Sequence, residues 1–78
     1  MPLDPLPASV LNRREIIGAR IRARRIHQNL TQQGLAEAVG IDLKTVHRIE
    51  YAQSDPRLSV LLLIADALDM PLAQLVDD

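Results

Sequence analysis

The apolar residues of this 78-residue chain recur at the three- and four-residue spacing of amphipathic helices. Ile17 and Ile21 mark the first such stretch, and Val46 and Ile49 lie one turn apart in the third. Five stretches of this kind follow one another, and none shows the strict alternation of a β-strand. The pattern therefore predicts an all-α fold, a compact bundle of five helices joined by short connections.

The first helix is predicted to run from Asn12 to about Gln28. Asn12 can cap its amino end, and Glu15 three residues later suits the return hydrogen bond of a capping box. Residues 1–11 hold three of the five prolines and show no periodicity. They are predicted to form a flexible proline-rich arm ahead of one domain over residues 12–78.

Capping residues also set the limits of the second and third helices. Thr31 is the expected N-cap of the second, and Gly40 stands where a left-handed residue would end it. Asp42 is the expected N-cap of the third helix, which should end near Glu50. Its carboxylate would lie at the positive end of the helix dipole.

The fourth helix is predicted over roughly residues 57–68, capped by Asp55 ahead of Pro56 or starting near Ser59. Pro71 suits the first turn of a short last helix. The apolar residues at core spacing in the fourth helix are Leu61, Ile64, Ala65 and Leu68.

The spacing within residues 32–49 is that of two helices that cross steeply. Counted from Gln32, a small residue falls at the fifth position (Ala36), glycine at the ninth (Gly40) and a β-branched apolar residue at the fifteenth (Val46). A close crossing needs the small side chain, and the tight turn needs a positive φ, which glycine adopts freely. This is the spacing of a DNA-binding helix-turn-helix, whose second helix lies in the major groove.

The formal net charge is −1, but the charges are unevenly distributed. Residues 1–30 hold six arginines against two acidic residues, a balance of +4, whereas residues 58–78 hold four aspartates and no basic residue. Because nearby charges matter more than the total, one face can still bind phosphate.

Composition argues against an enzyme, a metal site or a cofactor. The chain has no cysteine, and His27 and His47 fall on different predicted helices. No glycine-rich phosphate loop, HExxH motif or nucleophile elbow occurs. No apolar run is long enough to span a membrane, so a cytoplasmic protein is expected.

Several runs together resemble the lambda-repressor-like family of helix-turn-helix proteins (Xre, Cro and phage repressors) over about residues 16–76. They are IGARIR (17–22), LTQ (30–32), LA (35–36), TVHRIE (45–50) and LLLIADAL (61–68). The resemblance implies a five-helix fold without catalytic activity. It also implies binding to a pseudo-palindromic operator in double-stranded DNA as a homodimer.

The resemblance also implies roles for exposed residues of the helix over residues 42–50. Leu43, Lys44 and Arg48 are expected to face base edges, where lysine and arginine bind guanine and a leucine can pack on a thymine methyl. The alternative is that Lys44 and Arg48 are ordinary solvated charges. The expected contacts to DNA phosphates are Gln32, Gln33, Thr45, His47, Gln53, Ser54 and Arg57.

Two positions match an ion pair inside the family's fold, Arg25 and Glu50, which would tie the first helix to the end of the recognition helix. The chain also departs from the family. Glu50 is followed by Tyr51-Ala52 in place of Arg-Gly, so the next turn is expected to differ. Arg24 stands where leucine is usual. The arginines Arg13, Arg14, Arg20 and Arg22 form either a solvated face or an electrostatic rim for DNA.

A second apolar stripe on the fourth helix indicates a dimer interface. Its residues are Val60, Leu63 and Ala67, with Leu72 or Val76 of the last helix; alternatively, a small core simply covers more of this helix. A transcriptional regulator, most simply a repressor, fits these features. The alternatives are an antitoxin-type regulator that also binds a toxin protein, and a protein-interaction module without DNA binding.

Overall fold

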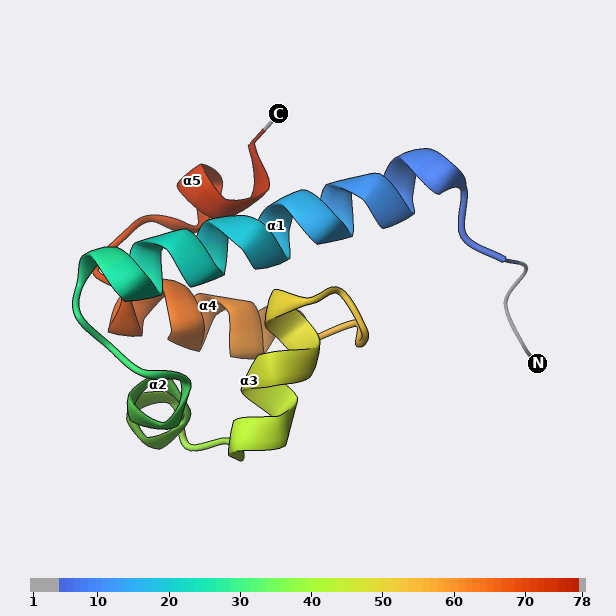
Figure 1. The fold of residues 1–78 in the computed structure, drawn as a ribbon. Helices are drawn as coiled ribbons and strands as arrows, with labels where there is room; N and C mark the ends of the chain where they lie inside the picture. The colour runs from blue at the N-terminus through green and yellow to red at the C-terminus, as the bar shows by residue number, and fades with distance from the viewer. Residues whose placement is uncertain (1–4, 78) are drawn as a thin grey trace.

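The computed structural model describes residues 5–77, and within that range it contains five helices and no strand. They are α1 (Ala8–His27), α2 (Gln32–Val39), α3 (Leu43–Glu50), α4 (Leu58–Ala67) and α5 (Leu72–Val76). Helix α1 runs the length of the molecule, with α5 on one side and α2 and α3 on the other (Figure 1). The predicted all-α fold of five helices is confirmed.

Helix α1 begins four residues earlier than predicted, at Ala8. Asn12 therefore lies inside the helix, and the predicted capping box with Glu15 is wrong. Pro7 occupies the N-cap position, and its carbonyl accepts hydrogen bonds from the backbone N–H groups of Val10 and Leu11. Residues 8–11, predicted to belong to the arm, form the first turn of α1. This turn projects beyond the bundle (Figure 1). Residues 1–4 lie outside the described part of the chain.

The caps predicted for α2 and α3 are confirmed. The Thr31 hydroxyl accepts a hydrogen bond from the Gly34 N–H at 2.9 Å, and the Asp42 carboxylate accepts one from the Thr45 N–H at 2.7 Å. Gly40 ends α2 with a φ of 84°, in the left-handed region. The turn between the two helices thus follows from local sequence.

The start of α4 was predicted less well. Arg57 occupies the N-cap position and no side chain caps the helix, so neither Asp55 nor Ser59 has the expected role. Pro71 lies at the N-cap of α5, one residue before the predicted place in the first turn. The backbone carbonyl of Arg57 instead begins the helix, accepting from Val60 and Leu61.

Every helix contributes to one core. Burying each of its larger apolar side chains contributes roughly 1.5–3 kcal/mol, so a domain of this size depends on all of them. The buried apolar residues are Ile21, Leu35, Ala36, Val46, Ile49, Ile64, Ala65, Leu68 and Leu75.

Helix α1 touches the carboxyl end of α3 at Gly18. A Cβ atom added to Gly18 would lie 2.4 Å from the carbonyl oxygen of Glu50 and 2.7 Å from that of Ile49. Only glycine permits so close an approach of two backbones. This contact fixes where α3 ends relative to α1.

Three helices end in the same left-handed turn without glycine. Asn29, Ala52 and Asp69 have φ values of 58°, 57° and 52°, and they follow α1, α3 and α4. After α3, the N–H of Gln53 reaches back to the carbonyl of Arg48 at 2.7 Å, as in a Schellman motif. Ala52 therefore adopts the conformation that glycine usually takes, and the Tyr51-Ala52 departure leaves a left-handed turn in place.

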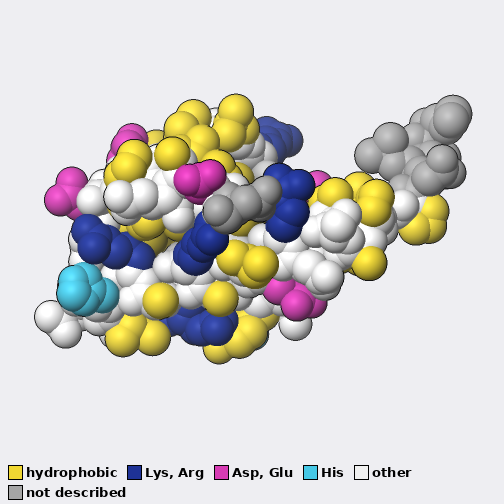
Figure 2. Space-filling model, turned by 90° about the horizontal axis from the view of Figure 1, so that it is seen from above, with side chains coloured by type: hydrophobic (Ala, Val, Ile, Leu, Met, Phe, Trp, Pro, Cys, Tyr) yellow, Lys and Arg dark blue, Asp and Glu magenta, His cyan; other side chains and the backbone are white. Residues whose placement is uncertain are grey.

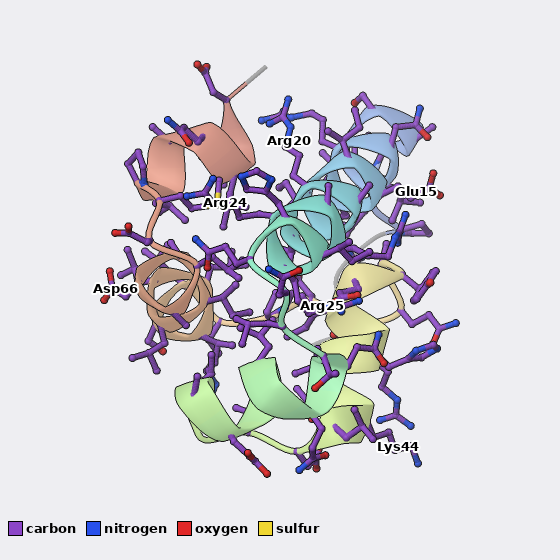
Figure 3. The ribbon with its side chains drawn as sticks, turned by 60° about the vertical axis from the view of Figure 1, so that its left-hand side comes forward. Glu15, Arg20, Arg24, Arg25, Lys44 and Asp66 are labelled. Atoms are coloured by element: carbon purple, nitrogen blue, oxygen red, sulfur yellow. The ribbon has the colours of Figure 1, made fainter. Side chains whose placement is uncertain are left out.

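The arginines of α1 close the carboxyl ends of other helices. Arg24 donates to the carbonyls of Leu68 and Asp69 after α4, at 3.0 and 3.2 Å. Arg20 donates to the carbonyl of Leu75 at 3.0 Å, near the end of α5. Figure 3 shows Arg20, Arg24 and Arg25 leaving α1 in different directions. These contacts satisfy carbonyls that have no partner within their own helix, at its negative end.

Candidate nucleic-acid interface

Helix α3 presents a polar outer face because its apolar face is buried. Val46 and Ile49 lie in the core, where α3 packs against α2 and α1. The exposed side chains of α3 are Leu43, Lys44, His47 and Arg48, and Thr45 is half-buried. Lys44 points away from the bundle, on the opposite side from Asp66 of α4 in Figure 3.

Leu43 is unusual on this face because it is a large apolar residue that is 45% exposed at the start of α3. The neighbouring Lys44 and the more distant Arg48 are charged. The structure thus places the three predicted base-contacting residues on one exposed helix, with an apolar side chain beside two cationic ones.

Asp42 holds the first turn of α3 in place. Hydrogen bonding from Thr45 lowers the pKa of the Asp42 carboxyl below its ordinary value of 3.8, and the charges of Arg48 and Lys44 act in the same direction. The folded state therefore favours the ionised form of this carboxylate. The carboxylate caps α3 under neutral conditions.

We expect Asp42→Asn to keep an acceptor for the Thr45 N–H but to remove the titrating group. Because the pKa of Asp42 is lowered in the folded state, its contribution is complete above the unfolded value of 3.8 and is lost as the pH falls through the folded value. Denaturant unfolding between about pH 6 and about pH 2 should show a shallower acid loss of stability for Asp42→Asn. Asp42→Ala should be less stable than Asp42→Asn at neutral pH. An acid dependence as steep as that of the parent protein would refute this role.

Glu50 lies at the centre of a buried polar network between three helices. Its carboxylate, on a residue only 1% exposed, accepts hydrogen bonds from Arg25 Nε at 2.7 Å and from Arg25 Nη2 at 3.1 Å. The hydrogen bond with Glu50 raises the pKa of the Arg25 guanidinium. Arg25 also donates to the Leu30 carbonyl at 2.8 Å. The ion pair that the family resemblance implies is present, and it joins α1 to the last residue of α3.

Gln32, predicted to contact a DNA phosphate, belongs to the same network. Its Nε2 donates to Glu50 Oε1 at 3.2 Å, so the side chain at the start of α2 is held in a fixed orientation. The amide group carries a second N–H for another acceptor. Gln33 is exposed and donates to Glu37 at 3.2 Å, within its own helix.

The loop after α3 contains three residues that were predicted to contact phosphate, and they differ in exposure. Gln53 and Arg57 have exposed side chains. The Ser54 hydroxyl is instead buried, and among residues 5–77 it has no hydrogen-bond partner. It lines a cavity of about 80 Å³ together with Arg14, whose Nε is also buried and unpartnered there. The side chain of Ser54 therefore faces the interior, contrary to the expectation that it faces DNA.

The residues predicted for a dimer interface divide into two groups. Val60, Ala67 and Leu72 are partly buried against the core. These three residues therefore fit the alternative in which the core covers more of the helix. Leu63 and Val76 are exposed. Two exposed leucines of α4 were not predicted, Leu58 and Leu62, although their four-residue spacing places them on one helix face.

A second apolar surface lies between α1 and α5. Ile16 and Val76 line a groove of about 280 Å³, flanked by Arg13 and Arg20. Figure 2, which looks down on α1 and α5, shows apolar side chains interrupted by arginines over this side of the molecule. Val76 therefore lies beside α1, in a groove that no leucine of α4 lines.

The contacts of Tyr51 were not predicted from the sequence, where this residue is only a departure from the family. The Arg22 guanidinium lies over the Tyr51 ring, 4.7 Å from its centroid. The rings of Tyr51 and His47 are also 4.7 Å apart, centroid to centroid. The four-residue spacing of His47 and Tyr51 was the available signal, since such residues are neighbours on a helix.

The described part of the chain contains neither a candidate metal site nor a candidate membrane span. No group of three or more histidine or acidic residues there could hold a metal ion. No helix in residues 5–77 is long and apolar enough to cross a membrane.

Comparison with known proteins agrees with this geometry. A family model described as helix-turn-helix, HTH_3, matches residues 21–75. The chain belongs to the lambda-repressor-like helix-turn-helix family. The comparison with curated protein sequences gave no match.

Several solved structures are similar in fold to this chain. The P22 c2 repressor, in complex with a synthetic operator, is 29% identical with a TM-score of 0.75; the match covers 80% of this chain and 94% of that one. The restriction-modification controller protein C.AhdI from Aeromonas hydrophila is 31% identical with a TM-score of 0.78, covering 86% and 97%. The SinR/SinI complex contains a chain that is 28% identical with a TM-score of 0.74, covering 80% and 61%. This helix-turn-helix chain is a DNA-binding transcription regulator.

Proposed function

We propose that this protein is a transcriptional repressor that reads a short DNA half-site with α3 and binds a pseudo-palindromic operator as a homodimer. The observation that carries the proposal is the outer face of α3, where Leu43, Lys44 and Arg48 are exposed on a capped helix. Val46 and Ile49 on the opposite face are buried in the core, so the helix turns this face toward solvent. The P22 c2 repressor, a structural relative, was solved with an operator.

In this proposal each exposed residue of α3 has a chemical role. Lys44 and Arg48 donate to guanine O6 and N7, the commonest specific contact in the major groove. Leu43 packs on a thymine methyl group. Phosphate contacts, which orient the protein without reading sequence, come from Gln32, Gln33, Thr45, His47, Gln53 and Arg57.

Dimerisation would repeat this readout on the second half-site, about one helical turn away. The exposed leucines of α4, Leu58, Leu62 and Leu63, support a self-complementary contact of the kind that a two-fold axis produces. Val76 lies on the groove beside α1 and would contribute only if the contact extended to that side.

Selection of binding sites from a randomised duplex library tests the proposal. The parent protein should enrich a pseudo-palindromic motif. Arg48→Ala should lose discrimination at particular base pairs, by about 1–3 kcal/mol per lost bidentate contact. Arg57→Ala is the matched control, since loss of a phosphate contact should weaken all sequences equally. No enrichment even at low salt would contradict the proposal.

A second candidate is an antitoxin-type regulator that also binds a protein partner. The exposed leucines of α4 favour it, because such a row can be covered by another protein as well as by a second copy. The SinR/SinI complex, one chain of which is a structural relative, is an assembly of two proteins. A monomer at high concentration that nevertheless selects a DNA motif would favour this candidate over the homodimer.

A further inference from the structure

The outer face of α3 does not stop at the end of the helix. Lys44, His47 and Tyr51 are spaced by three and four residues, so they follow one side of α3. Tyr51 then meets Arg22 of α1, whose guanidinium carbon lies 4.7 Å from the ring centroid. A line of cationic and hydrogen-bonding side chains thus passes from α3 onto α1.

We propose that Arg22 and His47, which both contact Tyr51, bind DNA backbone phosphate at the carboxyl end of α3. Arg22 and His47 supply the donors, and Tyr51 is a positioning residue whose ring orients both. The inference rests on the proposed function, since it extends the same DNA-binding surface. It assigns a DNA contact to α1 and a role to Tyr51.

Two interactions at the carboxyl end of α3 hold the Arg22 side chain in place. Its Nη1 donates to the Glu50 carbonyl at 3.3 Å, and the guanidinium is stacked on Tyr51. Both leave further N–H groups of the guanidinium for an anion, because arginine carries five. A guanidinium held on an aromatic face loses less conformational freedom when it binds phosphate.

Tyr51 contacts both donor groups. The ring is 50% exposed at the C-cap of α3, and the His47 ring packs against it with an interplanar angle of 38°. His47 is itself exposed, so its ring nitrogens can reach a bound phosphate. The tyrosine limits the rotamers of both neighbours without carrying charge.

Arg24 provides a matched control on the same helix. Like Arg22 it is half-buried and donates to carbonyls at a helix end, but those carbonyls belong to Leu68 and Asp69 after α4. Arg22→Gln and Arg24→Gln each keep a neutral donor and remove one positive charge. They therefore change the same chemistry at two places.

The test is the salt dependence of binding to a duplex that carries the selected motif, measured by fluorescence anisotropy. Arg22→Gln should make the negative slope of log K against log salt shallower by about 0.9, and Arg24→Gln should leave it unchanged. Tyr51→Ala should also make the slope shallower, whereas Tyr51→Phe should retain the slope of the parent protein because the ring remains. Thermal unfolding of each variant tests whether it is folded.

Two results would overturn the inference while leaving the proposed function intact. The first is that the parent protein binds DNA and Arg22→Gln has the same slope of log K against log salt. The other is a Tyr51→Ala variant that behaves like Tyr51→Phe, which would remove the ring from the contact. A folded parent protein that binds no duplex would instead refute the proposed function itself.

Discussion

Gly18→Ala is expected to destabilise this protein by about 1–3 kcal/mol or more, a large share of the stability of a small domain. The added Cβ would meet the Glu50 carbonyl oxygen at 2.4 Å and the Ile49 carbonyl oxygen at 2.7 Å. Both obstacles are backbone atoms, so no side-chain rotation relieves the clash. The end of α3 must move away from α1.

Denaturant unfolding of Gly18→Ala measures this effect, and Gly34→Ala is its control. The Cβ of the control would meet only the Thr31 hydroxyl at 3.3 Å and a Leu30 methyl at 3.5 Å. A gain of about 1 kcal/mol in helix propensity opposes that tighter contact, so a change within about 1 kcal/mol in either direction is expected. A Gly18→Ala protein as stable as Gly34→Ala would show that the two helices separate at little cost.

Arg25→Ala is expected to destabilise the protein by about 3–5 kcal/mol, the usual effect of removing one partner from a buried ion pair. The substitution leaves the Glu50 carboxylate, on a residue 1% exposed, with Gln32 as its remaining side-chain partner at 3.2 Å. An ionised carboxylate without its cation is costly in an interior of low dielectric. The Leu30 carbonyl loses its donor as well.

Unfolding measurements on three variants separate the ion pair from ordinary carbonyl contacts. Arg24→Ala removes an arginine that donates only to the carbonyls of Leu68 and Asp69, so about 0.5–1.5 kcal/mol per hydrogen bond is expected. The double variant Arg25→Met, Glu50→Leu should recover part of the loss, because no buried charge remains. If Arg25→Ala were no more harmful than Arg24→Ala, Glu50 would not depend on its partner.

The two predictions concern the same place in the fold. Gly18 and Arg25 both lie on α1, and both meet Glu50, the last residue of α3. A folded variant at either position is therefore also a test of how strictly DNA binding depends on the placement of α3. Site selection with such a variant should give a weaker motif than the parent protein.

Features that depend on neighbouring residues could be predicted from the sequence. The caps at Thr31 and Asp42 each join residues three apart, and the left-handed residue Gly40 follows from its own backbone freedom. The helical periodicity identified five helices, and the steep crossing of α2 and α3 followed from the spacing of Ala36, Gly40 and Val46. The exposed face of α3 followed in turn, because Val46 and Ile49 had to face the core.

Features that depend on distant residues could not. Arg22 donates to a carbonyl 28 residues away in the sequence, and Arg20 donates to one 55 residues away. Because such partners cannot be recognised from local sequence, it stayed open whether these arginines are solvated or bind DNA. The caps expected at Asn12, Asp55 and Ser59 were chemically suitable but unused. In each case the chain offered more than one local start.

By itself the sequence determined the helices, the turn of the helix-turn-helix and the face of α3 that meets solvent, because these follow from periodicity and from hydrogen bonds between near neighbours. Only the tertiary structure decided which way Ser54 faces, which apolar residues of α4 stay exposed, and that Arg22 lies over Tyr51. These depend on how α1, α3 and α4 pack. A side chain becomes buried, capped or stacked when other helices pack against it. The spacing of residues along one helix does not predict those contacts.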